Sequence, residues 1–396
     1  MEFLNLKKCV DRIIDYYKTP GVDCIVYKDH EMIFRYTAGM NDIEKNKKLD
    51  GNELYIIFSM TKMITCTAAL QLLEKGKYKL SDRLCDYMPE FGKMKIAANA
   101  LNTANAADIT TGKTSGEVAK NTISGYAQSP ITIKDLFIMS GGLDYDLGDE
   151  AITKAMAQGK TTTRDLVGAM SEKVLGFEPG TRFRYSLCHD VLGALIEIWS
   201  GKNLGDYMQE NIFEPLGMKN TFFGIPKDEQ RLERMAALYQ RDKDGNPQKK
   251  PLVCAFNLSD EYQSGGAGLV SCTEDYAVFL DALACGGMGK TGNRILNKET
   301  VGLMGTNHLT GMQSEDFFQL RPGYGYGFGV RTHIDKEKSG SLSPLGEFGW
   351  DGAAGAFSMV DTENKLSFTY FQHIHGWDIA IQSEMRNALY EDISLN

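Results

Sequence analysis

Several features that define other protein classes are missing from this sequence of 396 residues. No apolar run approaches the roughly 20 residues that a membrane-spanning helix needs. The eight cysteines are scattered without a Cys-x-x-Cys pair, so in a chain this long they indicate reduced thiols rather than a disulfide framework or a zinc site. Basic charge is not in excess either. The formal net charge of −9 argues against nucleic acid or an anionic membrane as the main partner.

The first residues also lack the pattern of an export signal. Residues 1–10, MEFLNLKKCV, do not combine a basic stretch with a following apolar stretch, so we expect a cytoplasmic protein. Apolar residues make up 42% of the chain and charged residues 24%, which is ordinary for a globular protein. The length allows one large domain or two lobes that share a core.

Patterns typical of cofactor binding are weak. Two loose matches to a phosphate-binding loop end at Gly112–Thr114 and Gly289–Thr291, but neither lies between a predicted strand and a helix. The alternating glycines of Gly323–Gly329 are typical of a strand that a neighbour approaches closely, not of a dinucleotide fold. His373 and His375 share one face of a predicted strand, without a third ligand at metal-binding spacing. We therefore expect no cofactor and no metal.

Predicted strands lie near both ends of the chain. Val22–Lys28 and Glu31–Ala38 have the pattern of a hairpin, and so do Ala356–Val360 and Leu366–Phe371. The residues between these hairpins are mostly helical in pattern. This order predicts an α+β fold in which an antiparallel sheet from both termini is flanked by helices and carries an inserted, mainly helical lobe.

We expect residues 1–396 to form a single unit with two lobes. Residues 1–56 and 264–396 would make the α/β lobe, and residues 57–263 the mainly helical lobe. Residues 97–129 are a low-complexity stretch rich in Ala, Asn, Thr, Gly and Ser, which we expect to be a surface excursion or a flexible flap.

One run in the helical lobe carries a candidate nucleophile. From Met63 onward the run Ser59–Lys75 is apolar on nearly every side, which predicts a helix buried in the centre of a domain, and Gly76 can end it. Lys62 follows Ser59 by three residues and so lies on the same helix face. A hydroxyl beside an amine at a buried helix end is a candidate nucleophile and base. About one chance Ser-x-x-Lys match is expected in a chain of this size, so other residues must decide.

Tyr185 is the next chemical candidate. It ends the predicted extended segment Thr181–Tyr185, and a tyrosine in such a place usually packs in a core. Beside a Ser-Lys pair, however, a tyrosine can pass the proton of the serine on to the leaving group.

Three motifs together resemble a known family. Ser59-Met-Thr-Lys62, Tyr185-Ser-Leu187 and Gly349-Trp-Asp-Gly-Ala-Ala-Gly355 match the order and spacing of the serine β-lactamase superfamily. The branch that they resemble most is the class C β-lactamase-like group that includes the family VIII carboxylesterases. The resemblance runs from about residue 20 to the C-terminus and includes flanking segments at Ile131–Leu136, Phe177–Gly180, Glu214–Met218 and Gly265–Ser271.

The resemblance implies a β-lactamase/penicillin-binding-protein-like fold and a role for each matching residue. Ser59 would be the acylated nucleophile. Lys62 would take its proton or hold Tyr185 deprotonated, and Tyr185 would act as general base and then acid. Either residue can be the base, because a strongly coupled pair titrates as a unit. The backbone amides of Ser59 and Ala353 would form the oxyanion hole, with Ala353 on the strand of the third motif.

The departures from the family pattern concern substrate choice. Trp350-Asp351-Gly352 stands where β-lactamases and D-peptidases carry Lys-Thr-Gly, and the literal Lys290-Thr291-Gly292 lies upstream in a glycine-rich loop. Leu187 stands where β-lactamases have an asparagine. Both changes remove polar groups that would hold penicillin-like substrates, and a tryptophan in place of the lysine resembles the esterase branch.

Two further residues, Asp351 and His189, are candidates for contact with the substrate. Asp351 would place a negative charge at the pocket wall and disfavour anionic acyl groups. His189, four residues after Tyr185, lies either near the site or in the core or surface.

The sequence therefore predicts a serine hydrolase of small carboxylic esters, with acyl transfer to an alcohol or amine as a further activity. One alternative is a β-lactamase or a D-amino-acid peptidase. A second is a binding domain that has the same fold without catalysis. The expected partner is a small ester or amide, and the patterns predict neither an acyl chain length nor an oligomeric state.

Overall fold

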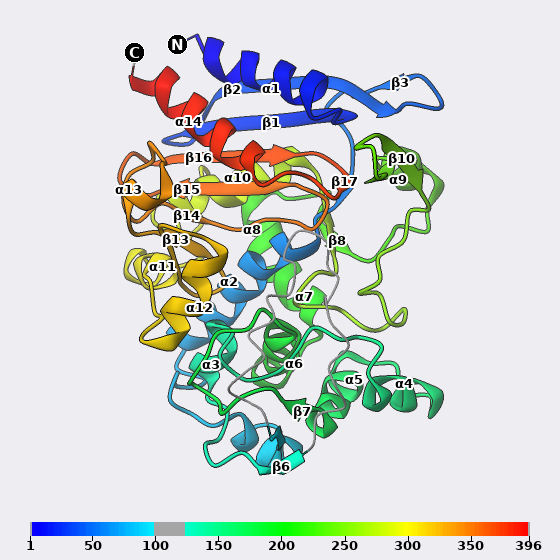
Figure 1. The fold of residues 1–396 in the computed structure, drawn as a ribbon, viewed down its shortest axis with the longest axis vertical. Coiled ribbons are helices and arrows are strands. Elements are labelled where there is room, and N and C mark those ends of the chain that lie inside the picture. The colour runs from blue at the N-terminus through cyan, green and yellow to red at the C-terminus, as the bar shows by residue number, and fades with distance from the viewer. Residues whose placement is uncertain (1, 99–122, 395–396) are drawn as a thin grey trace.

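The computed structural model describes residues 2–98 and 123–394 (Figure 1). Most of the low-complexity stretch predicted at 97–129 therefore lies outside the described residues. Its two flanks, β5 (Lys95–Ala97) and β6 (Ile123–Tyr126), pair as antiparallel strands. Among the described residues, no helix is both long and apolar enough to cross a membrane.

The two ends of the chain build one antiparallel sheet, as predicted. The amino-terminal hairpin joins the carboxy-terminal one through β1 and β16, with Cys24 opposite Tyr370. Within the described residues the strand order is β12 (Tyr324–Tyr326), β13 (Arg331–His333), β14 (Phe348–Gly349), β15 (Phe357–Asp361), β16 (Leu366–Phe371), β1 (Gly21–Lys28), β2 (Glu31–Asp42) and β3 (Lys47–Lys48).

Local chemistry explains the first hairpin. Asp29 and His30 both have positive φ, at 48° and 70°, which is the backbone of a two-residue turn that matches the twist of the strands. The strand indicated by the alternating glycines of Gly323–Gly329 is shorter than that pattern, because only β12 is extended before Gly329 turns with a φ of 76°.

Helices cover both faces of the sheet. The side chains of β1 alternate: Cys24 and Val26 pack in the cluster with α1 (Leu4–Tyr16) and α14 (Ala380–Ser394). Ile25 and Tyr27 face the other side, where Ala277 of α10 (Thr273–Ala284) packs on them. Figure 1 shows α1 and α14 side by side across the sheet.

The mainly helical part follows α2 (Thr61–Glu74), which packs against α6 (Cys188–Ser200). Most residues of α2 are buried, and Gly76 ends the helix with a φ of 66°, as predicted. The other helices are α3 (Ile133–Phe137), α4 (Glu150–Ala157), α5 (Thr163–Ala169), α7 (Leu204–Met208), α8 (Glu214–Leu216), α9 (Glu229–Arg234), α11 (Lys298–Gly305), α12 (Met312–Leu320) and α13 (Lys336–Ser339).

The described residues also form three small sheets, and one of them, β6–β5–β7, lies wholly within the mainly helical part. The one that matters for the site is β4–β11–β8, because β4 leads directly into the turn that carries Ser59. The strands of these sheets, besides β5 and β6, are β4 (Tyr55–Ile56), β7 (Val174–Leu175), β8 (Phe222–Phe223), β9 (Leu238–Arg241), β10 (Pro247–Lys250), β11 (Leu269–Ser271) and β17 (Ile374–His375).

Candidate active site

Ser59 lies in a strained turn between β4 and α2. The turn is a short 3₁₀ helix, Phe58–Met60, that continues directly into α2. Phe58 has a φ of 46°, which is unusual for a residue with a bulky side chain and is held in place by its buried surroundings. Backbone strain of this kind clusters at functional sites, and here it stands directly before the predicted nucleophile.

Lys62 is fully buried beside Ser59. Its Nζ donates hydrogen bonds to Ser59 Oγ at 3.2 Å, to the Tyr145 hydroxyl at 2.9 Å and to the Gly266 carbonyl at 2.7 Å. All three acceptors are neutral groups, and within residues 2–98 and 123–394 Lys62 forms no ion pair. Burial is the main cause that lowers the pKa of Lys62 from 10.5 to about 7, and the charge of Asp190 opposes it. A large fraction of this amine is therefore neutral at neutral pH and able to accept a proton.

Tyr185 is in contact with the same amine. Lys62 Nζ lies 4.5 Å from the centroid of the Tyr185 ring, and the Tyr185 hydroxyl accepts a hydrogen bond from Trp350 Nε1 at 3.1 Å. Burial raises the pKa of Tyr185, while hydrogen bonds with Ser59 and Trp350 lower it without cancelling the effect of burial. The structure thus brings Ser59, Lys62, Tyr185 and Trp350 together, and the phenol is protonated at neutral pH.

The third motif approaches the turn of Ser59 through Gly352. A Cβ on Gly352 would lie 2.7 Å from the carbonyl oxygen of Ile57, so only glycine allows this contact. Ala353 was predicted to lie on a strand, and this prediction is wrong, because the residue lies in the turn between β14 and β15. Its carbonyl accepts hydrogen bonds from His375 Nδ1 and Trp377 Nε1, both at 3.2 Å. These contacts fix the orientation of the turn.

Two backbone amides remain available at this junction. Across the described part of the chain, neither the amide of Ser59 nor that of Ala353 donates a hydrogen bond. Free backbone N–H groups, one in the strained turn of Ser59 and one in the turn of Ala353, are the donor type that an oxyanion hole requires.

Asp351 does not carry an unbalanced charge. Its Oδ2 forms a buried ion pair with Arg321, whose other hydrogen bond goes to Gln382 at 3.2 Å. The hypothesis that Asp351 repels anionic acyl groups is therefore wrong in its premise, because a guanidinium neutralises the carboxylate. The cation comes from the C-terminal end of α12, far from Asp351 in sequence.

Tyr145 is a site residue that the sequence analysis missed. Besides its hydrogen bond to Lys62, its ring stacks on that of Tyr185, with 5.3 Å between centroids and 12° between planes. Phe256 packs edge-on against it at 5.5 Å. Burial raises the pKa of Tyr145 well above its ordinary value. The available signal was the turn Ser140-Gly141-Gly142, which places a loop just before this tyrosine.

In the described residues, none of the candidate histidines forms a hydrogen bond with Ser59, Lys62 or Tyr185. His189 is fully buried in the core, where its Nε2 lies 3.2 Å from the Phe137 carbonyl, and burial lowers its pKa to about 3. His373 and His375 contact backbone carbonyls. In the described residues one group of three potential metal ligands occurs, His30, Asp281 and Cys285. There Asp281 already accepts hydrogen bonds from the backbone and the ring of His30, as a cap of the hairpin turn.

Comparison with known proteins identifies the family. Residues 6–387 match the family model described as Beta-lactamase, and the chain belongs to this family. It is 28% identical to Protein Rv1367c of Mycobacterium tuberculosis over 366 residues, which cover 89% of this chain and 86% of that protein. It is 25% identical to Esterase EstB of Burkholderia gladioli over 409 residues, which cover 98% of this chain and 94% of EstB.

A solved structure has the same fold. "EstCE1, a hydrolase with promiscuous acyltransferase activity" superposes with a TM-score of 0.77 at 24% sequence identity, over 98% of this chain and 97% of that chain. Fold class and family expected from the three motifs are both confirmed.

Proposed function

We propose that this member of the beta-lactamase family is a serine hydrolase of small carboxylic esters, with Ser59 as the nucleophile. The observation that carries the proposal is the hydrogen bond between Ser59 Oγ and the buried amine of Lys62. The other two groups that this amine contacts, the Tyr145 hydroxyl and the Gly266 carbonyl, are neutral. Esterase EstB among the relatives supports the choice of ester substrates.

The proposed acylation step uses the protonation states that burial favours. Neutral Lys62 takes the proton of Ser59 as Oγ attacks the ester carbonyl, since its pKa is about 7 while that of Tyr185 is raised. The amides of Ser59 and Ala353 stabilise the oxyanion. The proton then passes from Lys62 by way of the Tyr185 hydroxyl to the alkoxide as the ester C–O bond breaks. Water attacks the acyl-enzyme in the second half and returns Ser59 to its free form.

The pocket chemistry supports esters over penicillins and D-peptides. Trp350 occupies the position of the carboxylate-binding lysine and donates to Tyr185 instead, and the nearby guanidinium of Arg321 is engaged by Asp351. Tyr145, Tyr185 and Trp350 also give the site aromatic walls. Such walls limit water, so an alcohol acceptor can compete for the acyl-enzyme, and acyl transfer is the second candidate function.

Turnover of p-nitrophenyl acetate and butyrate and of a chromogenic cephalosporin, with Ser59→Ala as the matched variant, tests the proposal. We expect ester hydrolysis that the variant loses, and faster chromophore release when a short alcohol is added if acyl transfer takes place. Cephalosporin turnover far above ester turnover would favour a β-lactamase. Ser59→Ala with wild-type activity would exclude the mechanism.

We further propose that the protein works in a reducing compartment such as the cytoplasm. All eight cysteines are free, and five of them are buried thiols. Export to an oxidising compartment would expose this many thiols to wrong pairing. Cell fractionation with a marker for each compartment tests this proposal, and recovery of the protein with exported proteins would contradict it.

A further inference from the structure

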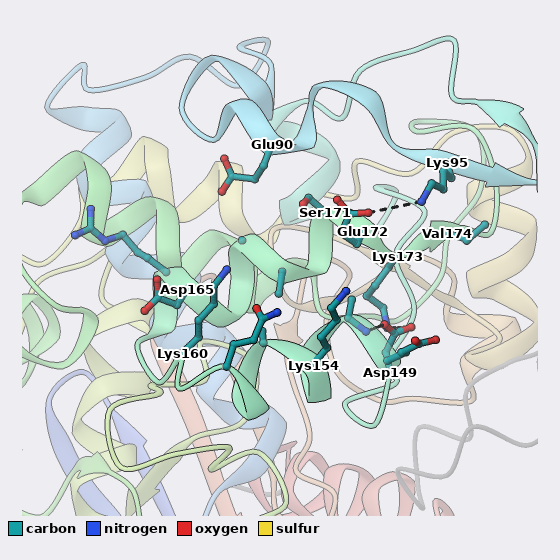
Figure 2. A pocket seen from close by; sticks show the side chains of 17 residues that line it. Glu90, Lys95, Asp149, Lys154, Lys160, Asp165, Ser171, Glu172, Lys173 and Val174 are labelled. Carbon is teal, nitrogen blue, oxygen red and sulfur yellow. Dashed lines mark hydrogen bonds and ion pairs between the residues drawn. The ribbon is translucent and has the colours of Figure 1, made fainter.

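A polar cavity of about 970 Å³ lies beside the helical part, between α4, α5 and the segment that ends at Val174 (Figure 2). Acidic and basic side chains line it in equal number, so its charge favours no class of ligand. One of its lysines differs from the others. Lys173 has only 1% of its side chain exposed, whereas Lys154 and Lys160 are exposed. Figure 2 shows Lys173 directed toward Asp149.

The three N–H donors of Lys173 meet three acceptors. Nζ lies 2.9 Å from Asp144 Oδ1 and 3.1 Å from Asp149 Oδ2, and it donates to the Asp146 carbonyl at 3.0 Å. All three acceptors belong to one loop, which runs from Gly142 to the start of α4. Asp149 also caps that helix through the amide of Ala151. Lys173 therefore ties together both sides of a short loop.

Tyr145 is in the middle of this loop. Its neighbours Asp144 and Asp146 both bind Lys173, while its own hydroxyl accepts from Lys62. The Asp144 carbonyl accepts from the Leu187 amide at 3.0 Å, two residues after Tyr185. The segment from Lys173 to Leu187 thus holds the loop of Tyr145 and also carries Tyr185.

The Gly142 end of the loop is fixed by close packing. The Gly142 carbonyl accepts from the Gly176 amide at 2.8 Å. Gly142 has a φ of 84°, and a Cβ there would lie 2.7 Å from the Phe177 carbonyl. With this end fixed, the remaining freedom of the loop lies between Leu143 and Asp149, where Lys173 binds.

From this geometry we propose that Lys173 is a positioning residue for the active site. It holds the loop so that the Tyr145 hydroxyl stays on Lys62 and the Tyr145 ring stays stacked on Tyr185. The inference rests on the proposed function for its effect on turnover, but the hold on the loop is a property of the protein alone. Without the ammonium group, Asp144 and Asp149 repel each other and the loop opens toward the cavity.

A double-mutant cycle separates this role from a general effect on folding. We expect Lys173→Met to lower kcat for p-nitrophenyl butyrate about five- to tenfold with little change in KM. The rate is expressed per active serine, counted by labelling with a fluorophosphonate, so that inactive protein does not lower it. In a Tyr145→Phe background the same change should cost less than about twofold, because the hydroxyl that it positions is gone. Lys173→Arg should restore at least half of the activity, since a guanidinium can bind both carboxylates.

Lys154→Met is the matched control, because it removes a lysine from the same cavity that the structure leaves exposed. An equal loss from Lys173→Met in both backgrounds, or the same loss in the control, would overturn the inference. Should Lys173→Met fold poorly, Asp144→Asn and Asp149→Asn replace it in the cycle, each removing one of the two carboxylates.

Hydrogen exchange of the amides of residues 143–149 gives a readout that needs no substrate. We expect faster exchange in Lys173→Met than in the wild type or in Lys154→Met. Unchanged exchange would overturn the inference even if the enzyme is active. Failure of the proposed function has a different signature, because the wild type would then hydrolyse no ester, while exchange would still decide whether Lys173 holds the loop.

Discussion

Two buried lysines, Lys62 and Lys173, have opposite surroundings. Lys173 binds two carboxylates and a carbonyl, whereas Lys62 binds a serine hydroxyl, a tyrosine hydroxyl and a carbonyl. Consecutive residues make the difference, since Asp144 binds Lys173 and Tyr145 binds Lys62. One loop therefore supplies a charged partner to one lysine and a neutral partner to the other.

The comparison shows how one fold contains a structural and a reactive lysine. Carboxylates balance the charge of Lys173, so its burial stabilises the loop. Lys62 is buried without such a contact, and burial lowers its pKa to about 7. The cost of burying an amine without an ion pair is consistent with a role in chemistry rather than in stability.

The largest effect that we predict separates the two roles at Lys62. Lys62→Met should lower kcat/KM for p-nitrophenyl butyrate by about a thousandfold, within the 10²–10⁴ range of general base catalysis. Its free energy of unfolding should stay the same or rise, because methionine fills similar space without a buried amine. Ester kinetics and urea denaturation measure both quantities. A variant as active as the wild type, or one that unfolds much more easily, would contradict the contrast.

Lys173→Met should have the opposite effects, with a small loss of activity and a clear loss of stability. We expect the free energy of unfolding to fall by about 2–3 kcal/mol, less than the 3–5 kcal/mol of a fully buried pair, because both carboxylates are partly exposed. Urea denaturation beside Lys62→Met and Lys154→Met tests this expectation. Equal stabilities of the two buried-lysine variants would remove the distinction between them.

Several elements of the fold could be predicted from the sequence, because each depends only on residues that are adjacent in the chain. The alternation in β1, the turn at Asp29-His30 and the apolar α2 are each determined by a few adjacent residues. Ser59 and Lys62 are three residues apart, in a 3₁₀ turn and in the helix that directly continues it, so their proximity was predictable from spacing. Tyr185 required the resemblance to a family, because nothing local places it beside α2.

The errors concern contacts made between distant segments. Tyr145 reaches Lys62 from 83 residues away, through a loop whose shape depends on Lys173 and Leu187. Asp351 was interpreted as an isolated charge because Arg321 lies 30 residues earlier on another element. Charge balance at a buried site is a tertiary property, so motifs can name the reactive residues without giving their electrostatics.

The pH profile sharpens the comparison further. Because neutral Lys62 is the proposed base, kcat/KM should rise about tenfold per pH unit below about pH 7 and level off above it. Lys62→Arg should stay inactive at every pH, since a guanidinium does not lose its proton. A wild-type profile that is flat from pH 5 to 8 would contradict this assignment of the base.

The same group links stability to pH. The folded pKa of Lys62, about 7, lies below the ordinary value of 10.5, so between these values the unfolded chain binds more protons at this site. Its destabilising effect is thus complete below about pH 7 and disappears as the pH rises toward 10.5. Relative to Lys62→Met, the wild type should gain stability over this range, as urea denaturation at several pH values can measure.

The smallest predicted effect concerns Asp190, a fully buried carboxylate that acts on Lys62 by its charge alone. It accepts hydrogen bonds from the Tyr262 and Ser264 hydroxyls, and its charge raises the pKa of Lys62 against the effect of burial. Asp190→Asn keeps an acceptor for both hydroxyls but removes the charge. The acid limb of kcat/KM should therefore move to lower pH, by less than about one unit.

A matched control for Asp190→Asn is Asp281→Asn, which changes a buried carboxylate that pairs with His30 instead. Profiles of the wild type and both variants from pH 5 to 9 decide the matter. A shift to higher pH in Asp190→Asn, or an equal shift in both variants, would mean that Asp190 does not set the charge balance of Lys62. A shift confined to Asp190→Asn would show that a carboxylate can adjust the pKa of the reactive lysine, Lys62, without direct contact. Carboxylates in direct contact with the amine instead give a structural lysine such as Lys173.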